Sequence, residues 1–132
     1  MLAHEALAFT DEEIQLLGAS IGKTIQVHGY TCYQCAIMPD HIHLLIRRHR
    51  DRAETMIESF QSESRQALIG AGRRAVTHPV WGGPGWKVFL NTPEDIVRII
   101  KYIRNNPLKT GRPAQDWPFI QPYNGWKPRF AR

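Results

Sequence analysis

The chain has 132 residues, of which 42% are hydrophobic and 22% charged, and its formal net charge is +5. This length allows one hydrophobic core but not two, and the composition is that of a globular protein. No apolar run is long enough to cross a bilayer, and residues 1–5 show no secretion signal, so we expect a cytoplasmic protein without a membrane partner. The basic balance favours a polyanionic partner but does not identify one.

The first predicted element is a helix over residues 11–20. Thr10 is a suitable N-cap, and Glu13 three residues later completes a capping box. Gly22 follows as a predicted stop signal for this helix.

A strand hairpin is predicted next. Residues 24–38 are rich in β-branched and aromatic residues and predict a strand, in which Gly29 is expected to mark a bulge. Pro39 and Asp40 predict a tight turn, because proline fixes its φ and the aspartate side chain can bond to the backbone just beyond. Residues 41–48 then predict a second, antiparallel strand.

A second helix is predicted over residues 51–69, where apolar residues recur at helical spacing, with Gly70 at its end. A loop rich in glycine and proline follows. Residues 86–90 then predict a short strand.

The last predicted helix has clear start and stop signals. Thr92 is its expected cap and Pro93 its first residue. It is predicted to run to about Asn105, because Pro107 cannot continue it. Residues 111–132 are rich in proline and aromatic residues and predict an irregular tail.

The predicted order is helix, strand, strand, helix, strand, helix, within a single domain over residues 1–132. Hairpin-linked strands with helices long enough to cover one face of a sheet indicate an α+β fold. One further strand at the start would give the βαββαβ order of a ferredoxin-like (RRM-like) fold, with an antiparallel sheet and the helices packed on one face. Residues 5–9 offer only a very short strand, so we expect the first strand to be short or missing.

Cys32 and Cys35 form a C-x-x-C pair. One such pair supplies half of a structural zinc site, and the sequence has no second pair. A redox pair would stand at a helix N-terminus, whereas these residues fall in a predicted strand, where a spacing of three points them to opposite faces. We therefore expect reduced cysteines, one in the core and one at the surface.

His41 and His43 are separated by one residue in a predicted strand. This spacing places both imidazoles on one face, while Ile42, Leu44 and Ile46 point to the other. Two adjacent imidazoles can share a divalent metal ion. The alternative is two surface histidines on a half-exposed strand, and the pair alone does not decide between these interpretations.

The last predicted helix carries an apolar stripe at helical spacing, formed by Ile96, Ile99, Ile100 and Ile103. Tyr102 and Asn106, four residues apart, lie along one edge of this stripe. A tyrosine at such a boundary is commonly a packing residue with its hydroxyl in water. A catalytic tyrosine would need the same placement, so the spacing leaves both interpretations open.

Two segments, in this order, resemble parts of a known enzyme family. Residues 38–46 (MPDHIHLLI) resemble the HUH segment (His, hydrophobic residue, His) of single-tyrosine transposases, which mobilise bacterial insertion sequences as single strands. Residues 102–107 (YIRNNP) resemble the helix that carries the nucleophile in that family. The Asn-Pro ending points to the REP-associated branch, whose members act on repeated palindromic elements. The resemblance covers about residues 24–111.

The resemblance implies a role for each matching residue. His41 and His43 correspond to the metal ligands of the family. Asn106 corresponds to the polar residue that completes the metal site, and Tyr102 to the nucleophile. The implied reaction is nicking and strand transfer on single-stranded or hairpin DNA, with Mg²⁺ or Mn²⁺ and a 5′-phosphotyrosine intermediate. Family members usually work as dimers, often with the tyrosine of one chain serving the histidines of the other, so we expect a homodimer.

Basic and aromatic residues are candidates for contacts with DNA. Each basic residue could equally be a solvated surface charge. The basic candidates are Arg47, Arg48, Arg50, Arg73, Arg74, Lys101, Arg104 and Lys109. The tryptophans could stack unpaired bases, although packing of the loop and tail onto the domain is the expected role for most of them. They are Trp81, Trp86, Trp117 and Trp126.

Two other functions remain open. A sheet without its first strand would expose backbone groups in its middle unless a partner chain or the tail fills the gap. A domesticated or truncated relative could therefore bind hairpin DNA without cutting it, although a pure binder has no need of the whole set of matching residues. An unrelated ferredoxin-like RNA-binding domain would show exposed aromatics on central strands, and Tyr30 and Tyr33 do not form that pattern.

Overall fold

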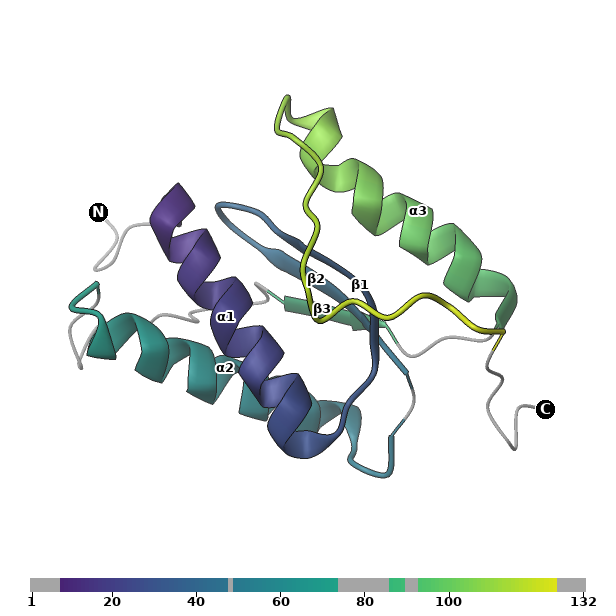
Figure 1. The fold of residues 1–132 in the computed structure, drawn as a ribbon, viewed down its shortest axis with the longest axis horizontal. Helices are drawn as coiled ribbons and strands as arrows, with labels where there is room; N and C mark the ends of the chain where they lie inside the picture. The colour runs from purple at the N-terminus through teal and green to yellow at the C-terminus, as the bar shows by residue number, and fades with distance from the viewer. Residues whose placement is uncertain (1–7, 48, 74–85, 90–92, 126–132) are drawn as a thin grey trace, which may run out of the picture.

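The computed structural model describes residues 8–47, 49–73, 86–89 and 93–125 (Figure 1). Its elements are, in chain order, α1 (Asp11–His28), β1 (Cys32–Ile37), β2 (Ile42–Ile46), α2 (Ala53–Gly70), β3 (Trp86–Phe89) and α3 (Pro93–Lys109). The helices pack against the sheet, which confirms the predicted α+β class and is consistent with a small ferredoxin-like arrangement. None of the helices within the described ranges has the length and hydropathy needed to span a bilayer.

The sheet formed by the described strands has the order β1-β2-β3. β1 pairs antiparallel with β2, as predicted. β3 pairs parallel with β2, with Ile42 opposite Trp86 and Leu45 opposite Phe89, so the sheet is mixed rather than fully antiparallel. β3 therefore covers the edge of β2 that a sheet without its first strand would otherwise leave open.

β1 and β2 are buried on both faces, and each face carries helices. Against α1 and α2 lie Ile42, Leu44 and Ile46 of β2. Against α3 lie Leu45 of β2 and Ala36 of β1. Figure 1 shows α3 across the sheet from the other two helices. α3 thus departs from the predicted packing of all helices on one face, because apolar side chains occupy both sides of these strands.

α1 begins as predicted and ends later than predicted. Thr10 Oγ1 accepts from Glu13 N at 3.2 Å, and Glu13 Oε1 accepts from Thr10 N at 3.0 Å, which completes the capping box. The helix includes residues 24–28, which the sequence assigned to a strand. It ends at Gly29, whose φ of 72° is left-handed. Gly29 is therefore a helix cap and not a strand bulge.

Gly22 lies inside α1, contrary to its predicted role as a stop. A Cβ at Gly22 would lie 3.1 Å from the ring of Phe119, and one at Gly18 would lie 2.1 Å from the ring of Trp117. Both aromatic residues belong to the C-terminal tail. The glycines therefore create space for the tail on the helix surface, and the surrounding packing outweighs their weak helix propensity.

α2 and β3 lie close to their predicted bounds, whereas α3 continues past its predicted end near Asn105 to Lys109. Pro107 lies inside its last turns. It cannot donate to the carbonyl one turn earlier, but its own carbonyl accepts from Thr110 N at 3.1 Å and from Arg112 N at 2.9 Å. These hydrogen bonds hold a short additional turn after the proline.

The described part of the tail runs along the outer edge of β1 (Figure 1). Gln121 N donates to Cys32 O at 2.8 Å. The Gln115 carboxamide accepts from Ile37 N and donates to Ile37 O, both at 2.8 Å. The tail therefore satisfies backbone groups at both ends of β1, while β3 fills the gap at β2.

Candidate active site

His41 and His43 lie at the beginning of β2, directly after the turn that follows β1. Met38 N donates to His41 O at 2.8 Å and closes this turn. The ring centroids of the two histidines are 4.6 Å apart, with their planes at 84°. Their imidazoles are therefore adjacent, as the spacing predicted. His43 is buried, with 3% of its surface exposed, and His41 is partly exposed.

Tyr102 of α3 contacts this histidine pair. Its ring centroid lies 5.7 Å from that of His43, with the planes at 79°. Ala36 of β1 lies between the two elements in this packing. It belongs to the same apolar cluster as the isoleucines of α3, and it is the register partner of His43 in β2. Tyr102 remains 42% exposed. Tyr102 is therefore packed against His43 on one side and remains accessible to an incoming molecule on the other.

Asn106 lies one turn after Tyr102 and is partly exposed. Its Nδ2 donates to the main-chain carbonyl of Tyr102 at 3.4 Å, so its side chain lies along the helix. Metal binding would use the carboxamide oxygen Oδ1, since divalent ions bind the oxygen and not the nitrogen of an amide.

Asp40 was predicted only as a turn residue, and the structure also places its carboxylate against His41. Its Oδ1 lies 2.6 Å from Nδ1 of His41. A carboxylate on one ring nitrogen fixes the tautomer and orientation of an imidazole, and leaves the other nitrogen to bind a metal. The adjacency of Asp40 and His41 in the sequence was the signal that could have identified this role.

The donor set fits a divalent ion with open positions. His41 and His43 offer imidazole nitrogens, and Asn106 offers an amide oxygen. Within the described ranges, no three side chains drawn from His, Cys, Asp and Glu are grouped so that they could hold a metal ion.

Lys109, one of the predicted phosphate contacts, lies beside Tyr102. Its Nζ is 5.2 Å from the centroid of the Tyr102 ring, within the range of a cation–π contact. The additional turn after Pro107 makes this contact possible.

Two arginines are ion-paired near the start of α1. Arg73, a predicted phosphate contact, pairs with Glu12. Arg112, which the sequence reasoning did not single out, pairs with Asp11 at 3.2 Å. Both arginines come from segments distant in sequence, so no local pattern could have identified these pairs.

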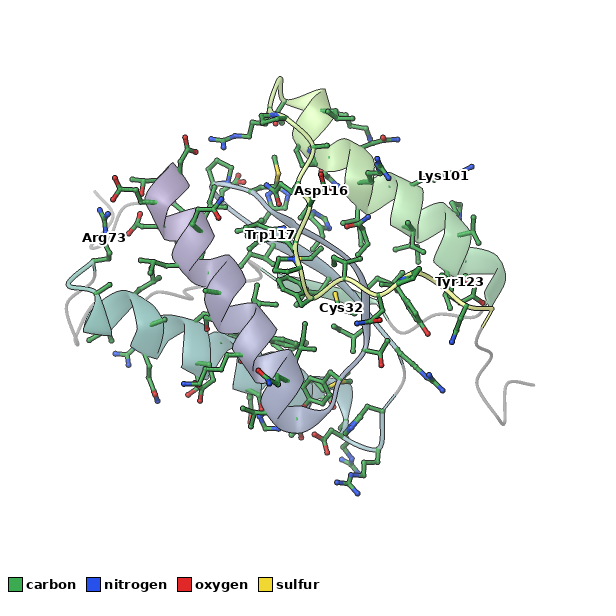
Figure 2. All side chains as sticks on the ribbon, in the orientation of Figure 1. Cys32, Arg73, Lys101, Asp116, Trp117 and Tyr123 are labelled. Carbon is green, nitrogen blue, oxygen red and sulfur yellow. The ribbon has the colours of Figure 1, made fainter. Side chains whose placement is uncertain are left out.

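The remaining basic candidates are spread over several surfaces. Lys101 and Arg104 are exposed on α3, and Figure 2 shows Lys101 pointing outward. Arg50 is exposed after β2, and Arg47 is partly buried. The candidates outside the described residues are Arg48 and Arg74.

Cys32 and Cys35 are both buried, which corrects the prediction that one of them is at the surface. A register shift between Cys32 and Gln34 in the pairing with β2 breaks the simple alternation of side chains, and both cysteines join one core cluster. Burial raises the pKa of Cys32 to about 12 and that of Cys35 well above its usual value. Both thiols are therefore neutral at ordinary pH.

Trp117 packs the tail onto the domain, as expected for most of the tryptophans. Its ring stacks with that of Phe119, with centroids 6.0 Å apart and planes at 13°. Its Nε1 donates to Oε1 of Gln115 at 3.0 Å. The side chains of Trp81, Trp86 and Trp126 lie outside the described part of the structure.

No protein-family model matches the chain, and comparisons with curated proteins and with solved structures find no match.

Proposed function

We propose that the protein is a metal-dependent DNA nickase and strand transferase, in which Tyr102 attacks a phosphodiester beside a divalent ion held by His41 and His43. The observation that carries the proposal is the contact between the Tyr102 and His43 rings, at 5.7 Å between centroids. A packing role does not require an exposed tyrosine beside a histidine pair. A nucleophile, in contrast, must stand beside the ion that polarises its target.

The proposed step conserves the energy of the cut. Tyr102 Oη forms a bond to phosphorus as the bond to the 3′ oxygen breaks, which gives a 5′-phosphotyrosine and a free 3′-OH. A bound Mg²⁺ or Mn²⁺ would supply Lewis-acid polarisation of the phosphate. His41, held by Asp40, and His43 would position that charge, with Asn106 as the third donor. A later 3′-OH can then rejoin strands without ATP.

The proposed substrate is single-stranded or hairpin DNA. The net charge of +5 and the exposed cations of α3, Lys101 and Arg104, support a polyanionic substrate near Tyr102. Such a substrate implies a cytoplasmic protein. Tyr102 and His43 meet within one chain, so the proposed site needs no tyrosine from a partner. A homodimer would then carry two complete sites.

The sheet topology favours the enzyme over a binding protein that has lost its activity. In a domesticated or truncated relative, a missing first strand would leave the middle of the sheet open. β3 covers that edge of β2 through four register pairs, from Ile42 with Trp86 to Leu45 with Phe89. The strand that carries His43 is therefore paired on both sides.

The test is a covalent adduct assay. The protein is incubated with labelled single-stranded DNA from the hairpin repeats that flank its gene, with Mn²⁺ or Mg²⁺, and resolved on a denaturing gel. We expect a metal-dependent band that Tyr102→Phe abolishes. Tyr123→Phe is the matched control, because the Tyr123 ring packs edge-on against Tyr33. Hairpin-specific binding without an adduct would overturn the nickase and leave a DNA-binding protein.

A further inference from the structure

The last turn of α3 exists despite a proline, and its hydrogen bonds explain how. The carbonyl of Pro107 accepts from Thr110 N at 3.1 Å, from Thr110 Oγ1 at 2.9 Å and from Arg112 N at 2.9 Å. Lys109 is exposed and adds nothing to the core. The turn does, however, keep Lys109 helical, which fixes the direction in which its side chain leaves the backbone.

Helical geometry brings Lys109 back to the face of Tyr102. Residues about two turns apart lie close to one line along a helix, since each residue rotates by about 100°. Lys101, in contrast, is adjacent to Tyr102 in the chain and therefore points in a different direction. The Lys109 Nζ is accordingly 5.2 Å from the centroid of the Tyr102 ring. The same ring contacts His43, at 5.7 Å between centroids.

We propose that Lys109 is a catalytic residue whose ammonium group binds a non-bridging oxygen of the phosphate that Tyr102 attacks. This inference rests on the proposed function. It adds to the divalent ion of the proposed site a second positive charge, which the protein itself supplies. A phosphate in line with Tyr102 Oη lies within reach of the flexible lysine stem, whose Nζ already stands over the ring. Lys109 is thereby distinguished from the other cations of α3, which would contact the strand away from the reacting atoms.

The chemistry of the step explains why a cation is useful there. The bond from Tyr102 Oη to phosphorus forms as the bond from phosphorus to the 3′ oxygen breaks. The phenolic proton leaves to solvent, and the 3′ oxygen takes up a proton to become a hydroxyl. Negative charge gathers on the non-bridging oxygens during this exchange. An ammonium group already in place stabilises that charge without reorganising.

The experiment separates chemistry from binding. Single-turnover rates of adduct formation are measured at saturating labelled oligonucleotide, and dissociation constants are measured separately, for Lys109→Met, Lys109→Arg and the matched control Lys23→Met, at an exposed lysine of α1. We expect Lys109→Met to lower the rate on the order of a hundred- to a thousandfold, as for loss of one charge-stabilising group. Lys109→Arg keeps a cation and should retain part of the rate. Lys23→Met should leave both the rate and the dissociation constant within about twofold, as for a surface substitution outside the site.

Each outcome decides between stated alternatives. Equal rates for Lys109→Met and Lys23→Met would overturn the role of Lys109 while leaving the nickase standing. No adduct from the unsubstituted protein would overturn the proposed function and this inference with it. Melting temperatures are recorded alongside, and Lys109→Gln, which lacks the charge but keeps a polar helix-forming side chain, provides the same comparison if the methionine variant unfolds.

Discussion

The indole ring of Trp117 rests on Gly18 of α1, so closely that a Cβ at position 18 would lie 2.1 Å from Cζ3 of the ring. The same indole donates to Gln115, whose carboxamide bonds to both backbone groups of Ile37. One short segment of the tail therefore joins α1 to the edge of β1. Its packing depends on the absence of a side chain at position 18.

Gly18→Ala is expected to destabilise the protein. Overpacking typically costs about 1–3 kcal/mol, which exceeds the helix propensity gain of about 0.5–1 kcal/mol from replacing glycine by alanine. The free energy of unfolding, measured in urea, tests this. Gly70→Ala is the control, because a Cβ there meets nothing within 4 Å. A Gly18→Ala protein as stable as the Gly70→Ala protein would refute the docking of Trp117 on α1.

The sequence predicted the residues of the candidate site better than it predicted their contact. The period of a strand placed His41 and His43 on one face, and the period of a helix placed Tyr102 and Asn106 on one edge. Both patterns depend only on local geometry. The meeting of Tyr102 with His43 depends on how α3 packs on the sheet, which no local pattern encodes. Only the resemblance to a family suggested it.

The errors at helix ends have the same cause. Gly22 and Pro107 are both strong local stop signals, and both lie inside helices. At Gly22 the deciding contact is with Phe119, which is distant in sequence. At Pro107 it is a set of hydrogen bonds from Thr110 and the residues that follow. Tertiary packing and loop hydrogen bonds overrode propensity in each case.

Alkaline pH is expected to weaken the fold. Burial raises the pKa of Cys32 from 9.0 to about 12, and burial together with the hydrogen bond to Asp51 raises that of Tyr30 from 10.0 to about 12. The unfolded chain therefore loses these protons at lower pH than the folded protein does. The stability that the protonated forms of Cys32 and Tyr30 contribute to the folded protein is fully present below about pH 9 and is lost as the pH rises towards 12.

Urea unfolding at several pH values between neutral and strongly alkaline measures this loss. Cys32→Ala should flatten the decline in the free energy of unfolding that begins near the ordinary pKa of a thiol. Tyr30→Phe should flatten the part of that decline that begins near the ordinary pKa of a phenol. The readout is the slope of the free energy of unfolding against pH, because either substitution also changes the stability at neutral pH. A free energy of unfolding that stays constant into the alkaline range would contradict the burial of these groups.

Asp40→Asn is expected to weaken metal binding without removing a ligand. The Asp40 carboxylate lies 2.6 Å from His41 Nδ1 and is placed to hold the ring in one orientation. Loss of such a partner typically lowers metal affinity about 10–100-fold. Titration with Mn²⁺, followed by electron paramagnetic resonance, measures the change. Because imidazole donors suit Mn²⁺ better than Mg²⁺, the unsubstituted protein should bind Mn²⁺ more tightly.

Asp95→Asn is the control for the metal titration. Asp95 pairs with Arg98, three residues further along α3, at 2.6 Å. Its loss should leave the Mn²⁺ affinity unchanged. If Asp40→Asn and Asp95→Asn bind Mn²⁺ as tightly as the unsubstituted protein, the carboxylate has no role in orienting a metal ligand.

Because Tyr102 contacts His43 within one chain, we predict that each tyrosine acts with the histidines of its own chain and not with those of a partner. A His41→Ala chain keeps its tyrosine, and a Tyr102→Phe chain keeps its histidines. If each tyrosine serves the histidines of its own chain, co-refolding the two variants restores no adduct. If it serves those of a partner, mixed dimers regain one complete site, and the adduct forms on the His41→Ala chain.

Co-refolding Tyr102→Phe with the unsubstituted protein is the control, since active chains should then label in proportion to their amount. We expect no restoration, because the packing of α3 already brings Tyr102 to the histidine pair of its own chain.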